Sequence, residues 1–137
     1  MRSAEICELA GVSYRMLDYW TRLGLFSGGT VGRGSGTVRQ WDEVQAITVL
    51  AIGSAQGIAY KQNVVTYRWL EGQVRRWWDR DPSMSGAYLL ITSAGTEVVS
   101  HFDGAFGDAW LVVALEPCAT RVREYLASRL TAVASGQ

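Results

Sequence analysis

The most constraining feature of the sequence is the stretch from Val12 to Leu25, where two side-chain patterns overlap at helical spacing. One pattern predicts a stripe that faces a core: Met16, Leu17, Trp20 and Leu23. The other predicts an outward face that carries two guanidiniums, a carboxylate and a phenol: Arg15, Asp18, Tyr19 and Arg22. A helix buried on all sides has no use for such a face, whereas a helix in the major groove of DNA does.

The residues before this helix predict a second, shorter one. Ser3 is expected to be its N-cap, and its apolar stripe is Ile6, Leu9 and Ala10. Gly11 can adopt the positive φ that ends a helix, and Ser13 lies where the next helix needs an N-cap. Two short helices joined by a tight turn predict a helix-turn-helix. The alternative is a generic helical hairpin.

A glycine-rich segment follows at residues 28–36, between Leu25-Phe26 and the β-prone residues 37–41. This arrangement predicts a two-stranded wing with a long tip, in which backbone amides and Arg33 can approach phosphates closely. A loop without fixed structure is the alternative. A nucleotide-type phosphate loop is not expected, because no Gly-Lys-Ser/Thr sequence closes the segment.

A third helix is predicted after the wing. Asp42 and Gln45 have the spacing of a capping box, and Gly57 is expected to end the helix. Its expected buried stripe consists of Val44, Ile47, Leu50 and Ala51.

These motifs occur in a recognisable order. Tyr-Arg-x-Leu-x-Tyr-Trp-x-x-x-Gly-Leu, a Gly/Ser-rich wing, Gly-Thr-x-Arg-x-Trp, a helix and Gln-Gly-Ile together resemble the MerR family of winged-helix regulators, in an actinobacterial-type branch. The resemblance covers about residues 3–62. It implies that Ser13, Tyr14 and Arg15 open a recognition helix that touches base edges and nearby phosphates. It also implies that Tyr19 and Arg22 contact the DNA backbone and that Arg39 anchors the wing strand near a phosphate.

Asp18 departs from this resemblance, because many family members carry an arginine there. Asp18 follows Arg15 by three residues and precedes Arg22 by four, so its carboxylate can hold either guanidinium in a fixed pose. The alternative is that it accepts a hydrogen bond from a cytosine amino group. We favour the orientation of the arginines.

Composition limits the remaining choices. Thirteen basic and thirteen acidic residues cancel, so DNA binding must depend on local placement of a few arginines. Two cysteines without CxxC spacing and a single histidine, His101, predict no zinc site, and no cofactor is expected. We interpret Cys7 as a buried free thiol and keep Cys118 open as a redox candidate. No apolar run is long enough to span a bilayer and no signal pattern opens the chain, so a cytoplasmic protein without membrane contact is expected.

A fourth helix is predicted over residues 59–79, with a stripe of Tyr67, Leu70, Val74 and Trp77. Asp79–Ser83 ends it, which leaves too short a helix for a free-standing coiled coil. Trp69, Trp77 and Trp78 are interpreted mainly as core residues, with an aromatic ligand pocket or a dimer contact as alternatives.

The pattern then becomes strand-like. Strands are predicted at 88–92, 97–101 and 109–115, the last as a central strand buried on both faces, and an amphipathic helix is predicted from Pro117. The expected class is α+β: an N-terminal winged helix-turn-helix (residues 1–62), a connecting helix and linker (63–82), and a small β-β-β-α domain (83–137) with one helix across its sheet. The last domain is similar to the C-terminal domain of the same actinobacterial branch. Its open sheet edge and uncovered face are where we expect a second copy to dock.

Three functions compete. The first is a dimeric, sequence-specific regulator of transcription that binds double-stranded DNA and, as such regulators do, contacts RNA polymerase. The second is an excisionase-like recombination directionality or architectural factor of a mobile element, which would bind tandem sites and bend DNA. The third, a small-molecule binding protein or enzyme, lacks a catalytic constellation, so no enzymatic activity is expected.

Overall fold

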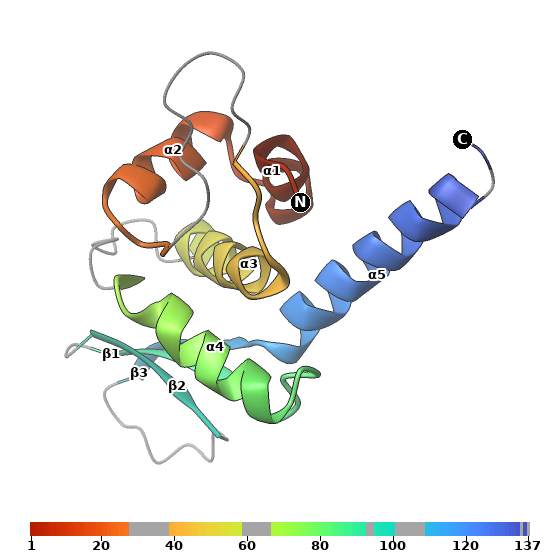
Figure 1. The fold of residues 1–137 in the computed structure, drawn as a ribbon. Helices are drawn as coiled ribbons and strands as arrows, with labels where there is room; N and C mark the ends of the chain where they lie inside the picture. Colours follow the sequence, from red (N-terminus) through yellow and green to blue (C-terminus); the bar gives the residue numbers. More distant parts are fainter. Residues whose placement is uncertain (28–38, 59–66, 93–94, 101–108, 135, 137) are drawn as a thin grey trace.

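The computed structural model describes residues 1–27, 39–58, 67–92, 95–100, 109–134 and 136 of the 137-residue chain (Figure 1). In these residues the elements follow one another in this order: α1 (Ser3–Ala10), α2 (Tyr14–Arg22), α3 (Glu43–Ile58), α4 (Leu70–Arg80), β1 (Tyr88–Thr92), β2 (Gly95–Val99), β3 (Ala109–Ala114) and α5 (Glu116–Ala134). The predicted α+β class is confirmed. Glycine-rich residues 28–38, including Arg33, and His101 lie outside the described residues.

The turn between α1 and α2 forms as predicted. Gly11 ends α1 with φ 67°, and the Ser13 hydroxyl accepts the Met16 N–H at 3.1 Å as the N-cap of α2. The prediction that Ser3 caps α1 is wrong, because Arg2 is the N-cap and Ser3 is the first helical residue. The Ser3 hydroxyl instead accepts the Trp41 indole N–H at 2.9 Å, which links α1 to the segment before α3.

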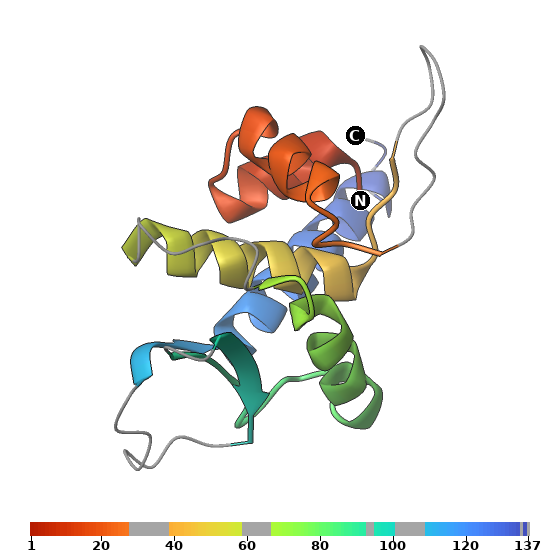
Figure 2. The same cartoon turned by 90° about the vertical axis from the view of Figure 1, so that its left-hand side faces the viewer.

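Helix α3 passes through the centre of the molecule, with α1 and α2 on one side and α4 and the sheet on the other (Figure 2). The predicted capping box is confirmed, since Asp42 and Gln45 each accept the other's backbone N–H, at 2.8 and 3.0 Å. The predicted stripe is buried, but so is every other residue from Val44 to Ile52. The helix also continues through Gly57 to Ile58, one residue beyond its predicted end. A helix that contacts α1, α4, α5 and β3 has no solvent face over most of its length.

The fourth helix is confirmed only over its second half. Residues 59–66 lie outside the described residues, and the helix begins at Leu70 after a turn at Tyr67. Tyr67, Leu70 and Val74 of the predicted stripe are fully buried, and Trp77 is half-buried. The three tryptophans differ in burial: Trp77 and Trp78 pack against the core, whereas Trp69 is 74% exposed.

The three strands form an antiparallel sheet in the order β2-β1-β3. Strand β1 has its predicted bounds, whereas β2 begins two residues earlier than predicted. The prediction that β3 is a central strand buried on both faces is wrong. β1 is central and buries Leu89, Leu90 and Ile91, whereas residues 111–114 of the edge strand β3 are only half-buried. Both strands read as apolar runs, and such a run does not show which strand has two neighbours.

The terminal helix also departs from its predicted place. Helix α4 packs on the sheet through β2, and α3 contacts β3, whereas α5 packs mainly against α3 and α1. The second half of α5 extends away from the rest of the molecule (Figure 1). Buried side chains from α1 through to the first turns of α5 form a single hydrophobic cluster, so the predicted N-terminal and C-terminal segments share one core.

Candidate nucleic-acid interface

Helix α2 exposes the charged face that the sequence predicts. Arg15, Asp18, Tyr19 and Arg22, here called the α2 face, are all exposed, with Tyr19 at 45%. The opposite side of the helix is fixed to the core by Leu17 and Trp20, which are 2% and 0% exposed. The α2 face is therefore presented to solvent by a helix that cannot rotate without exposing a tryptophan.

Asp18 pairs with one of its two expected partners. Its Oδ2 lies 3.2 Å from the Arg22 Nε, and both side chains are more than half exposed. An exposed i,i+4 pair of this kind contributes only about 0.3–0.5 kcal/mol to stability. Its physical effect is to restrict the directions that the Arg22 guanidinium can take.

The start of α2 is partly as predicted. The Ser13 hydroxyl is used as the helix cap, and Tyr14 is 65% exposed beside Arg15. The prediction that Met16 belongs to the buried stripe is wrong, because its side chain is 43% exposed. At 100° per residue Met16 lies at the margin of the arc centred on Leu17 and Trp20, and so it borders the exposed surface.

The two ends of the glycine-rich segment meet at a pair of aromatic rings. The Phe26 and Trp41 ring centroids are 5.2 Å apart at an interplanar angle of 76°, an edge-to-face contact. The first two residues of the chain contact Gln40 and Trp41. The Met1 ammonium donates to the Trp41 carbonyl at 2.8 Å, and Arg2 forms a β-bridge with Gln40. Arg2, which the sequence did not single out, is an exposed cation beside the outgoing end of this segment.

Arg39 is less accessible than its expected phosphate contact would suggest. Its guanidinium lies 4.0 Å from the centroid of the Trp41 ring, and its side chain is half-buried. Burial lowers the pKa of Arg39, although the nearby charge of Glu71 acts in the opposite direction. Arg39 thus already contributes to the structure at the base of the segment.

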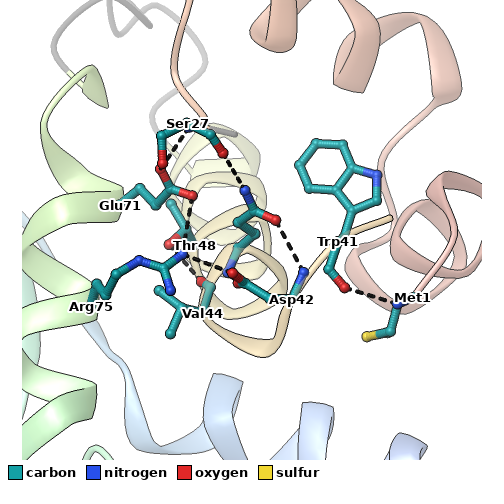
Figure 3. A network of polar contacts seen from close by, with 9 residues as sticks. Met1, Ser27, Trp41, Asp42, Val44, Thr48, Glu71 and Arg75 are labelled. Carbon is teal, nitrogen blue, oxygen red and sulfur yellow. Dashed lines mark hydrogen bonds and ion pairs between the residues drawn. The ribbon is translucent and has the colours of Figure 1, made fainter. Parts of the chain in front are cut away.

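The buried carboxylate of Glu71 in α4 binds Ser27, the residue directly before the glycine-rich segment (Figure 3). The Ser27 N–H and hydroxyl both donate to Glu71 Oε2, at 2.7 and 2.6 Å, and the Ser27 carbonyl accepts from the Gln45 side chain at 2.5 Å. Arg75 donates to Asp42 at 2.9 Å and lies 3.5 Å from Glu71 Oε1. We call these five residues the Glu71 network: Ser27, Asp42, Gln45, Glu71 and Arg75.

Little in the sequence indicated this network. Glu71 is only 4% exposed and meets Ser27 across 44 positions of the chain, a separation that no helical or strand period reveals. The available signal was an acidic residue beside Leu70 and Val74 in a stripe that is otherwise apolar. A carboxylate in such a position needs partners, because burial of an unpaired charge is costly.

The described residues offer little for other chemistry. No group of three His, Cys, Asp or Glu side chains in the described ranges could hold a metal ion. No helix in the same ranges is long and apolar enough to cross a membrane. Burial raises the pKa of the Cys118 thiol to about 11, so it stays protonated and weakly nucleophilic at neutral pH. Burial also raises the pKa of Cys7, which is half-buried.

Comparison of the chain with models of known protein families and with curated proteins finds no match.

Proposed function

We propose that the protein is a sequence-specific regulator of transcription that binds double-stranded DNA through the α2 face. The observation that carries this proposal is the division of one nine-residue helix into a side fixed by Leu17 and Trp20 and an exposed side with Arg15 and Arg22. A short helix held in this way can enter a major groove without rearranging the core.

The charge distribution favours DNA recognition through a small number of arginine contacts. The chain has no net charge, so affinity cannot come from a general cationic surface. Arginine can bind guanine through two parallel hydrogen bonds, which suits Arg15 for a base edge. Arg22, held by Asp18 at 3.2 Å, is suited to a phosphate of fixed position.

We also propose that the protein acts as a dimer through its C-terminal region. The Gln73 side chain accepts the Val98 N–H at 2.7 Å, which protects the β2 edge of the sheet. The β3 edge carries only apolar residues, and the extended end of α5 exposes Leu130 and Val133 at 72% and 70%. Both surfaces can lie on a two-fold axis with a second copy. Leu130→Glu should yield monomers in light scattering if α5 forms the contact, whereas dimers that survive this change would favour the β3 edge.

Selection of binding sites from a random duplex pool by the full-length protein tests the function. We expect an inverted repeat whose half-sites are one helical turn apart, or a multiple of it, because each half-site would meet one α2. Direct repeats would contradict this proposal and support a recombination or architectural factor. A pool without any enriched sequence would contradict both.

A further inference from the structure

A pocket of about 480 Å³ lies where the sheet meets the start of α5. It is outside the candidate DNA interface and involves none of the α2 face. Its lining comes from the residues before and at the start of β1, from the end of β3 and from the first turns of α5, and includes Tyr88, Ala114, Glu116, Pro117, Thr120 and Arg121. The pocket is open to solvent, and its volume is in the range of small-molecule sites.

The lining combines apolar, polar and charged residues. Tyr88, Pro117 and Ala114 supply surface on which a flat apolar body can pack. Thr120 and Arg121 supply hydrogen-bond donors, and the guanidinium matches the geometry of a carboxylate. Glu116 lies at the exposed start of α5, and its negative charge disfavours a ligand with a second acid group.

Arg121 has a second role. Its Nη2 donates to the carbonyl oxygen of Leu9 at 2.6 Å, across 112 positions of the chain. Leu9 belongs to the last turn of α1, where backbone carbonyls lack helical partners and a positive charge is favourable. Arg121 therefore lines the pocket and, through its guanidinium, also stabilises the end of the helix that leads directly into α2.

We propose that this pocket binds a small organic monoanion, a carboxylate with a ring-sized apolar body. The carboxylate pairs with Arg121, and the ring packs on Tyr88 and Pro117. The ligand competes with the Leu9 carbonyl for Arg121, so occupancy loosens the end of α1. The expected consequence for DNA affinity rests on the proposed function, whereas the binding site itself does not.

The test uses 4-fluorobenzoate and fluorine NMR with the full-length protein. We expect saturable broadening of the fluorine signal by the wild-type protein and at least a roughly tenfold weaker affinity for Arg121→Gln, because a charge-assisted contact is lost. Arg76→Gln is the matched control, since Arg76 is an exposed arginine of α4 that donates to the Gly72 carbonyl of its own helix and does not line the pocket. Its affinity should stay within about twofold of wild type. In competition with 4-fluorobenzoate, the dianion terephthalate should displace the fluorinated ligand less effectively than the monoanion benzoate does.

Absence of saturable binding to the wild-type protein would overturn the proposal, as would equal losses in the two arginine variants. If Arg121→Gln fails to fold, Ala114→Leu decides, because it fills the pocket and keeps the guanidinium; undiminished binding to that variant would overturn the proposal. Binding that leaves the amide hydrogen exchange of α1 unchanged would overturn the competition with Leu9. None of these readouts requires DNA, so failure of the proposed function would show separately as an absence of duplex binding.

Discussion

The α2 face and the Glu71 network use similar side chains for opposite purposes. On α2, Arg22 and Asp18 are 70% and 54% exposed, and their one ion pair lies within a single helix. In the Glu71 network the carboxylate is almost fully buried, and its contacts join α4 to Ser27 and, through Arg75, to Asp42. Exposed charges cost little to keep and are available to a partner, whereas buried charges are committed to the structure. Charge alone therefore does not identify a binding surface; burial and the number of segments joined do.

The largest expected effect lies in the buried network. Glu71→Ala should lower the free energy of unfolding by about 2–4 kcal/mol, because two Ser27 donors lose their acceptor and Arg75 keeps only one of its two carboxylate partners. Chemical denaturation measures this loss. Asp18→Asn is the matched control and should change stability by less than about 0.5 kcal/mol. Similar losses in the two variants would abolish the distinction between the regions.

The next effect belongs to the α2 face. Arg15→Ala should weaken binding to the selected duplex by about 1–3 kcal/mol and relax base preference at one position of each half-site. Its melting temperature should stay close to wild type, because the Arg15 side chain is exposed. Equal weakening on every sequence would make Arg15 a phosphate contact instead of a base-reading residue.

Arg39 is intermediate between the exposed α2 face and the buried Glu71 network, since it is half-buried on Trp41. Arg39→Ala should weaken binding to all duplexes alike, reduce the salt dependence by about one phosphate contact and also lower stability through the lost ring contact. Affinity measured against salt concentration gives the first result and denaturation the second. An unchanged salt slope, with stability lost, would mean that Arg39 stabilises the fold and does not contact a phosphate.

The smallest expected effect is that of Asp18→Asn on DNA affinity. If the carboxylate holds Arg22 in position, its removal should weaken binding about twofold, since the pair is worth about 0.3–0.5 kcal/mol in isolated helices. A gain in affinity would instead show that Asp18 only repels phosphate.

Local features of the fold could be predicted from the sequence. The positive φ of Gly11, the caps at Ser13 and Asp42, and strand β1 depend on residues a few positions apart. The burial of Leu17 and Trp20 follows from helical spacing in the same way.

Features that depend on distant segments were missed. The edge position of β3 is set by which strand pairs with β1, and the all-round burial of α3 by the four elements around it. The same distinction between local and long-range features applies to the candidate site. The exposure of the α2 face was predictable, whereas the Ser27–Glu71 contact joins residues 44 positions apart. The Leu9–Arg121 contact, which lies outside this interface, joins residues 112 positions apart and was missed for the same reason.

The duplex affinities of two double variants, which remove the same charge from different surfaces, distinguish DNA reading by the α2 face from general charge attraction. Arg15→Ala with Arg22→Ala removes two arginines from the α2 face, and Arg76→Ala with Arg123→Ala removes two exposed arginines from α4 and α5. Fluorescence anisotropy should show a loss of at least about 100-fold for the first pair and less than about threefold for the second, at equal melting temperatures. Equal losses would mean that binding follows net charge and that the α2 face does not read DNA.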